Sequence, residues 1–422
     1  MVDVLIRGAH VVDGTGRTPV QADVAIAGDR IAAVGDLGGP PAGRVIEGRG
    51  FILAPGFVDV HSHSDYFLLV NPRAESAVRQ GVTTEIGGNC GYAAAPVFGA
   101  WREERVAHYR EVYGLDHPWS HVGEYFAHLK GERPAINFGL LIGHNTIRGS
   151  VMGGADRQAT AEELAALATA VRRGMDEGAL GLSTGLIYPP ACFAPGAELT
   201  ALATVAREAG GVLTCHMRSE GDRLLEAIDE IIGVVRAAAI PLQISHLKTS
   251  GPGNWAKLPE AIERIERARS AGQDVTADRY PYTASNTELQ AILPNWARAG
   301  SRGERLARLQ DAAARARLIE ELQERRWDQI MIAEVTEKRH KRYEGLRVSQ
   351  AAALAGQPPP AFVLDLLAAE QCRVDAILFT MSETNLQEIL RHPYVMIASD
   401  SGTRTHAGPL ARGRPHPRTF GT

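Results

Sequence analysis

The sequence predicts an α/β fold, a (β/α)8 TIM barrel preceded by a small β-domain. The chain opens with about fifty residues rich in short β-like runs separated by turn formers. From Phe51 onward, apolar runs alternate with helical stretches, which favours parallel strands joined by crossover helices. Eight such runs suggest a closed barrel. They cover residues 51–61, 83–87, 137–143, 179–184, 211–216, 241–246, 274–278 and 394–399.

The predicted domain organisation follows from these patterns. We expect the small β-domain over residues 1–54 and the barrel over residues 55–422. The stretch from about 284 to 376 is too long and too helical in pattern for a simple connection between strands seven and eight. Its Ala/Arg/Glu/Leu-rich part, residues 301–326, predicts a helical insertion that acts as a lid.

Composition agrees with a large enzyme and argues against a nucleic-acid-binding or membrane-bound protein. The 422 residues are 45% hydrophobic, and the well-mixed charges sum to −4, which argues against a nucleic-acid or anionic-membrane partner. The N-terminus lacks the pattern of a signal peptide, and no run of about 18 apolar residues could span a membrane. A cytoplasmic location is therefore the default expectation. The four cysteines show no C-x-x-C pair.

Five polar residues at predicted strand ends form a candidate metal site. His61 and His63, two positions apart on an extended segment, would project to the same side. Three later apolar runs end in His216, His246 and Asp400. Because chemistry in such barrels gathers at the C-terminal ends of the strands, these side chains are expected to converge. Their nitrogen and oxygen donors suit zinc and similar divalent ions.

This pattern of His-x-His, two single histidines and a final Asp resembles the amidohydrolase superfamily of metal-dependent hydrolases. Five segments look like its D-aminoacylase branch, the N-acyl-D-amino-acid deacylases, and the resemblance spans nearly the whole chain. They are Gly87-Gly-Asn-Cys-Gly91, Cys215-His-Met-Arg-Ser-Glu220, Ser245-His-Leu-Lys248, Tyr280-Pro-Tyr-Thr-Ala-Ser285 and Ala398-Ser-Asp-Ser-Gly402. Relatives continue beyond the point that matches Thr422, so we interpret the C-terminal part as truncated.

The resemblance implies a zinc centre with assigned ligands. One tight site would use Cys90, His216 and His246, and a second, weaker site would use His61, His63 and Asp400. Zinc lowers the pKa of bound water and polarises an amide carbonyl. Asp400 would be the general base and later the proton donor to the leaving amine, because a carboxylate beside a metal can both accept and return a proton.

Substrate-binding residues are expected beside the metal. Lys248, two positions beyond His246, would emerge on the same side and could pair with a substrate α-carboxylate. Tyr280 and Ser285 match the substrate-contacting segment of the family, and Tyr188 would line the same cavity. For each tyrosine, packing in the core is the alternative interpretation.

The predicted reaction is hydrolysis of the amide bond of a small-molecule N-acyl-D-amino acid to a carboxylate and a free D-amino acid. One alternative is a cyclic-amide hydrolase of the hydantoinase or dihydroorotase type. Those relatives usually present a carboxylated lysine on the fourth strand, and Ala179-Leu-Gly-Leu-Ser-Thr-Gly185 contains none. The other alternative is a metal-binding protein without catalysis. The sequence fixes neither the preferred side chain and acyl group nor the oligomeric state.

Overall fold

The computed structural model describes residues 2–408, 410–419 and 421, which divide into two units, Met1–Phe57 and Val58–Thr422. The first unit is one sheet in the order β3-β2-β1-β4, with β5 also paired to β1. Gly8, at φ +64°, lies where the register of β1 against β2 shifts, so β1 is one strand with a bulge. The strands are β1 (Val2–Val11), β2 (Val20–Ala27), β3 (Arg30–Gly35), β4 (Ala42–Glu47) and β5 (Ile52–Leu53).

The second unit contains the predicted barrel. Strands β9 to β13 and β17 form one parallel sheet in the order β17-β13-β12-β11-β10-β9, and β6, β7 and β8 form another. A parallel bridge between Ser62 and Ser401 joins the first strand position to the last. The strands are β6 (Phe57–Asp59), β7 (Val82–Gly87), β8 (Asn137–Leu140), β9 (Ile142–Gly143), β10 (Gly181–Gly185), β11 (Val212–His216), β12 (Leu242–Ile244), β13 (Val275–Arg279) and β17 (Val395–Ile397).

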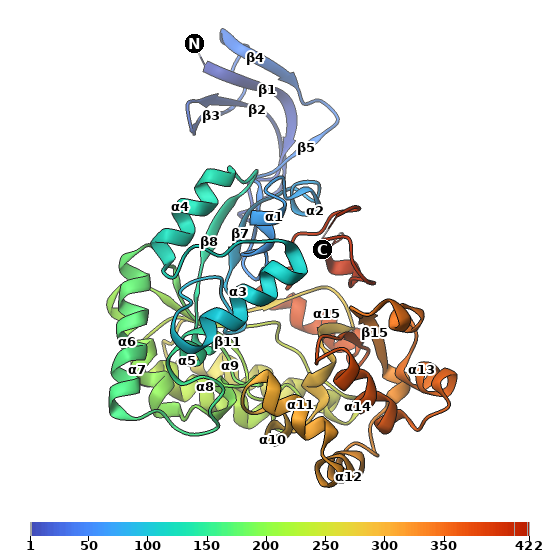
Figure 1. The fold of residues 1–422 in the computed structure, drawn as a ribbon. Coiled ribbons are helices and arrows are strands. Elements are labelled where there is room, and N and C mark those ends of the chain that lie inside the picture. Colours follow the sequence, from blue (N-terminus) through green and yellow to red (C-terminus); the bar gives the residue numbers. More distant parts are fainter. Residues whose placement is uncertain (1, 409, 420, 422) are drawn as a thin grey trace. The chain divides into compact units, whose positions relative to one another are not determined.

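Helices cover the outside of these strands, as the alternating pattern predicted (Figure 1). Helix α6 begins with a capping box, because Thr160 and Glu163 exchange side chain to backbone hydrogen bonds. The helices are α1 (Phe67–Val70), α2 (Glu75–Val78), α3 (Gly99–Tyr113), α4 (Val122–Glu132), α5 (His144–Met152), α6 (Ala161–Asp176), α7 (Gly196–Glu208), α8 (Leu224–Ala238), α9 (Leu258–Ser270) and α15 (Glu383–Arg391).

The hydrophobic core lies between strands and helices. Leu182, Leu213, Leu242 and Val275 sit opposite one another on four neighbouring strands and are all buried. Helix α8 adds a buried stripe, Ile228, Ile231 and Val235, at the spacing of one helix face. This packing fixes the strand ends that carry the candidate ligands.

The predicted first barrel strand, residues 51–61, is wrong as a single element. Ile52–Leu53 is β5 and pairs with β1 of the small sheet, whereas the barrel strand β6 begins only at Phe57. Pro55 and Gly56 separate the two strands, since proline offers no backbone N–H to a sheet ladder and glycine weakens a strand.

The insertion between strands seven and eight is not purely helical, which corrects the prediction. It contains an antiparallel sheet, β14 (Ser285–Glu288), β16 (Asp375–Leu378) and β15 (Ile330–Glu334) in that order. The stretch 301–326, predicted to be helical, forms two helices, because Asp311 caps the second one by accepting a hydrogen bond from the N–H of Ala314. The helices are α10 (Asn295–Arg298), α11 (Arg302–Gln310), α12 (Ala312–Glu321), α13 (Val348–Ala355) and α14 (Pro359–Ala369).

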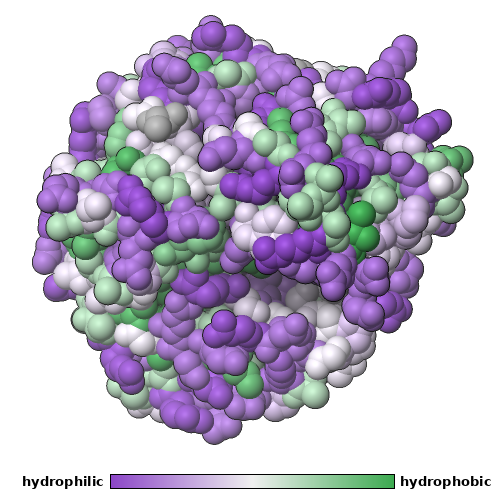
Figure 2. All heavy atoms as spheres, turned by 60° about the horizontal axis from the view of Figure 1, so that its bottom comes forward, coloured by the Kyte–Doolittle hydropathy of each residue, from purple (hydrophilic) through white to green (hydrophobic). Residues whose placement is uncertain are grey.

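The surface carries mostly hydrophilic side chains on the face shown in Figure 2, with hydrophobic residues scattered among them. Of the helices that the structure describes, none is both long enough and apolar enough to cross a lipid bilayer.

Candidate metal centre

Each candidate ligand lies at or just beyond the C-terminal end of a barrel strand. His61 and His63 follow β6, Cys90 follows β7, His216 ends β11, His246 follows β12 and Asp400 follows β17. All are buried except His63, which is half-buried. The structure therefore brings together the six residues that the sequence analysis selected.

The first donor group consists of Cys90, His216 and His246. The Sγ of Cys90 lies 3.5 Å from Nε2 of His246, and this nitrogen lies 3.0 Å from Nδ1 of His216. Glu220 Oε1 is 2.8 Å from the other nitrogen of His246, Nδ1, and can accept its proton. With Nδ1 directed at Glu220, Nε2 is the nitrogen of His246 that faces the group and would bind a metal.

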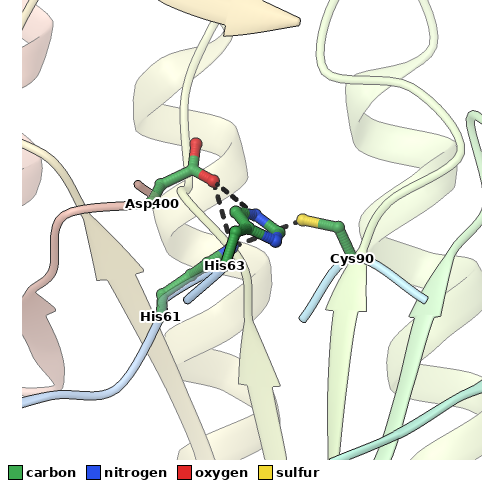
Figure 3. A group of neighbouring side chains, drawn as sticks. All are labelled: His61, His63, Cys90 and Asp400. Carbon is green, nitrogen blue, oxygen red and sulfur yellow. Dashed lines mark hydrogen bonds and ion pairs between the residues drawn. The ribbon is translucent and has the colours of Figure 1, made fainter. Parts of the chain in front are cut away.

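The second donor group consists of His61, His63, Asp400 and again Cys90, and its four side chains point toward one another (Figure 3). Asp400 Oδ1 lies 3.0 Å from Nε2 of His63 and 3.2 Å from Nε2 of His61. The same His61 nitrogen lies 3.3 Å from the Sγ of Cys90. Because Cys90 belongs to both groups, the two candidate metal positions are adjacent and can share one thiolate.

Asp278 supports the ligands and was missed by the sequence analysis. Its Oδ1 accepts a hydrogen bond from Nδ1 of His61 at 3.0 Å. Since Nδ1 donates to Asp278, Nε2 is the nitrogen of His61 that faces Cys90 and Asp400 and would bind a metal. The available signal was the position of Asp278 at the end of the seventh predicted strand, which matches the positions of the recognised ligands.

Three ligands have a left-handed backbone, which non-glycine residues rarely adopt. The φ angles are +53° at Cys90, +39° at His246 and +47° at Asp400. Each such residue costs roughly 1–3 kcal/mol and persists only where its surroundings fix it. Asp400 N–H donates to the carbonyl of His61 at 2.8 Å, one of the contacts that hold it. Strain of this kind is concentrated at functional sites.

The loop of Cys90 is held by close packing against Gly91. The N–H of Gly91 donates to Ser183 Oγ at 3.1 Å, and Gly91 has φ +79°. A Cβ at this position would lie 1.8 Å from Oδ1 of Asn145. Only glycine fits here, because both the backbone conformation and the available space exclude a side chain.

Charges around the site keep the acidic donors ionised. Burial alone would raise the pKa of Asp400, but the guanidinium of Arg418, 3.0 Å from Oδ2, and the imidazole of His61 hold it well below its usual value. Burial would likewise raise the pKa of Cys90, yet His61 and His246 hold it well below the ordinary thiol value. A carboxylate and a thiolate are the forms that bind metals.

Arg418 is the second residue that the sequence analysis missed. It is buried, and its guanidinium lies 4.6 Å from the centre of the Tyr280 ring as well as against Asp400. It comes from an irregular segment after the last strand, where no periodicity or spacing distinguishes it from neighbouring arginines.

The four predicted substrate residues differ in their placement. Lys248 is ion-paired with Glu220, and its Nζ lies 2.8 Å from Nδ1 of His246. Burial would raise the pKa of Glu220, but Lys248 and His246 hold it well below its usual value. Lys248 therefore lies directly behind a ligand of the first group.

The two tyrosines also lie beside the first group. The Tyr188 ring stands edge-on to His216 with centroids 4.9 Å apart, and its hydroxyl lies 3.2 Å from Thr287 Oγ1 of the insertion. Tyr280 is fully buried, and within the described residues its hydroxyl has no hydrogen-bond partner.

Ser285 is placed differently. It begins β14 opposite Leu378 and is half-buried. The hydrogen bonds and ring contacts of the described residues connect the other three predicted substrate residues with ligands, but do not connect Ser285 with one.

The comparison with known proteins agrees with this geometry. Residues 44–405 match the amidohydrolase family, and the chain belongs to that family. The N-acyl-D-glutamate deacylase of Alcaligenes xylosoxydans xylosoxydans is 34% identical over 424 residues, covering 100% of this chain and 77% of that protein. The D-aminoacylase of the same organism is 31% identical over 431 residues with the same coverage.

Solved structures of deacylases and aminoacylases are also similar to this chain. N-acyl-D-glutamate deacylase from Bordetella bronchiseptica, complexed with zinc and a phosphonate inhibitor, has a TM-score of 0.81 at 32% identity over 100% of this chain and 79% of that one. A D-aminoacylase structure described for its binuclear metal center matches with the same TM-score, identity and coverage. The predicted family and the (β/α)8 fold are confirmed.

Replacing Gly91 tests the packing of the Cys90 loop. Gly91→Ala should lower the free energy of unfolding by about 2–4 kcal/mol, because the new methyl group both strains a left-handed backbone and overpacks against Asn145. Gly210→Ala is the matched control, since Gly210 has φ +78° and open space around its Cβ position. Denaturant unfolding measures the free energy of unfolding of both variants. Equal losses in the two variants would contradict the close-packing argument.

Proposed function

We propose that this chain is a zinc-dependent deacylase that hydrolyses the amide bond of N-acyl-D-amino acids to a carboxylate and a free D-amino acid. The observation that carries the proposal is the pair of adjacent donor groups that share Cys90, with the ionised Asp400 facing them. The names of three relatives that align with the whole chain support the substrate class: N-acyl-D-glutamate deacylase, D-aminoacylase and N-acyl-D-aspartate deacylase.

The donor set fits zinc. One thiolate with two imidazoles, and a carboxylate with two further imidazoles, are nitrogen, sulfur and oxygen ligands of the kind zinc accepts. The first group would hold the tight zinc and the second group a weaker one. When bound, zinc supplies a Lewis acid that polarises the amide carbonyl and makes a bound water more acidic.

Asp400 would move the proton during hydrolysis. Its carboxylate accepts a proton from the attacking water and later returns it to the nitrogen of the departing amine, so that the carbon–nitrogen bond breaks with a neutral leaving group. Arg418 holds Oδ2 of this carboxylate, and His61 and His63 flank Oδ1. These contacts keep Asp400 ionised and oriented before the reaction.

Lys248 and Tyr280 would bind the substrate carboxylate. The ammonium of Lys248 can exchange part of its contact with Glu220 for a substrate carboxylate, and the unpartnered hydroxyl of Tyr280 can donate to the same anion. The Tyr280 ring lies 5.8 Å from Nζ of Lys248, so both groups can reach one ligand. Tyr188 would line the cavity from the other side of His216.

The reaction class can be tested with a panel of amides. Purified zinc-loaded protein is incubated with N-acetyl-D-amino acids, their L-enantiomers and a cyclic amide such as a hydantoin, and amine release or ring opening is measured. We expect the N-acetyl-D-amino acids to be hydrolysed faster than their L-enantiomers and the cyclic amide. Turnover of the cyclic amide alone would favour the hydantoinase alternative, and no turnover by folded, metal-loaded protein would favour a binding protein.

Metal analysis tests the two donor groups. We expect about one equivalent of zinc to remain after dialysis and a second to bind only at higher zinc concentration, because the first group offers three buried donors on rigid strand ends. Cys90→Ser should lose the tight zinc, whereas His61→Asn should weaken only the second equivalent. Elemental analysis of folded protein is the measurement. Less than about a tenth of an equivalent in wild-type protein would contradict the assignment.

Asp400→Asn tests the proton transfers. The change removes the base with little change in size, so turnover should fall by about two to four orders of magnitude while tight zinc is retained. Asp328→Asn, on an exposed aspartate, is the control and should leave turnover unchanged. Retention of more than about a tenth of wild-type turnover by Asp400→Asn would assign the proton transfer to another residue.

Lys248→Met tests carboxylate recognition. The variant should raise KM for an N-acetyl-D-amino acid by roughly ten- to a hundredfold, the value of a charge-assisted contact of about 1.5–3 kcal/mol. A decarboxylated N-acetylamine should be a poor substrate for wild type and lose little more on mutation. Lys257→Met is the control, since Lys257 Nζ contacts the backbone carbonyl of Asp222. Loss of zinc, or equal losses for both substrates, would show instead that Lys248 supports His246.

A further inference from the structure

We propose that Asp278 is a positioning residue that couples the two donor groups of the metal centre, an inference that rests on the proposed metal-dependent function. Asp278 lies at the end of β13 and is completely buried. It belongs to neither group of candidate ligands, yet it contacts one residue of each.

The two side-chain contacts of Asp278 with candidate ligand residues meet at a single oxygen atom. Oδ1 accepts a hydrogen bond from Nδ1 of His61 at 3.0 Å and another from the backbone N–H of His246 at 2.9 Å. Oδ2 accepts a hydrogen bond from Nε2 of Gln243 at 2.7 Å. The backbone carbonyl of Asp278 also accepts from the N–H of Leu247 at 2.9 Å, so the residue holds both sides of the turn at His246.

On the His61 side, the carboxylate fixes which ring nitrogen carries the proton. A carboxylate can only accept, so Nδ1 of His61 donates to it, and Nε2 is the nitrogen left facing Cys90 and Asp400, where it would bind a metal. Asp278 thereby prepares the second donor group.

On the His246 side, the same oxygen stabilises an unusual backbone. His246 has φ +39°, and its buried N–H finds its acceptor in Asp278. Without this acceptor the N–H would be buried and unsatisfied, which favours relaxation of the turn. Because the ring follows its backbone, relaxation would swing Nε2 away from Cys90 and His216. Asp278 thereby also shapes the first donor group.

Because one oxygen holds a residue of each group, loss of Asp278 removes both effects together. Loss of His61 leaves Asp278 in contact with the N–H of His246 and with Gln243, so His246 keeps its support. Among the ligands themselves, Cys90 belongs to both groups, and the rings of His61 and His246 lie with centroids 5.1 Å apart. Loss of Asp278 should therefore weaken metal binding at both positions, whereas loss of the ligand His61 should weaken the second position alone.

Asp278→Asn is the central variant, since it keeps the size and one acceptor oxygen but removes the charge. We expect both zinc equivalents to bind about ten- to a hundredfold more weakly, the usual effect of changing a residue that supports a metal ligand. Binding is measured by titration against a competing chelator. Gln243→Ala, which removes only the partner of Oδ2, is the matched control and should change both affinities less than threefold.

The comparison with His61→Asn decides whether Asp278 couples the two donor groups. If Asp278→Asn weakens only the second equivalent, as His61→Asn should, Asp278 acts through His61 alone and the coupling is refuted. Unchanged affinity for both equivalents would refute the positioning role altogether.

A measurement on the wild-type protein keeps the proposal testable if the variant does not fold. Nitrogen-15 NMR of labelled histidines should show His61, assigned by its absence in His61→Asn, protonated at Nδ1. An Nδ1 without a proton, with the ring protonated at Nε2 alone, would overturn the proposal. Two-site zinc binding with an Nδ1–H tautomer but no amide hydrolysis would refute the proposed function and leave the role of Asp278 intact.

Discussion

The backbone hydrogen bond from Asp400 to the carbonyl of His61, 2.8 Å long, joins the last strand position of the barrel to the first. Together with the bridge between Ser62 and Ser401 it closes the ring of parallel strands. Closure places the C-terminal ends of all strands on one face. The candidate centre depends on this constraint, because its donors come from five different strand ends and approach one another only when the ring is complete.

Burial of so many polar groups is stable because each charge has a partner. Arg418 lies against Asp400, Lys248 against Glu220, and the imidazole of His61 against Asp278. An isolated buried charge would cost several kcal/mol, whereas a paired and hydrogen-bonded one recovers much of that cost. The sulfur of Cys90 and the facing nitrogens of His61 and His246 are arranged differently, because they point at one another. A cation between them would satisfy all of these donors together.

The sequence predicted the parts of the fold that depend on local pattern. Apolar runs that alternate with helical stretches predicted the barrel, and polar residues at the ends of the apolar runs predicted the candidate ligands. Asp278 fits that same rule but lacks a distinctive spacing. The sheet of the insertion could not be predicted, because Glu288, Glu334 and Asp375 lie on strands that pair across long intervals of helical sequence. The position of Arg418 is set by the path of an irregular segment, which no periodicity encodes.

Closure of the ring also imposes an order on events during synthesis of the protein. His63 and Asp400, which face each other in the second donor group, are 337 positions apart in the chain. A ribosome completes the residues of the first group at His246, long before it reaches Asp400. On the growing chain, His61 and His63 are therefore present before Asp400 has been synthesised. Contacts between residues so far apart in the sequence form slowly. The group proposed to bind zinc tightly is the one whose set of ligands is completed first.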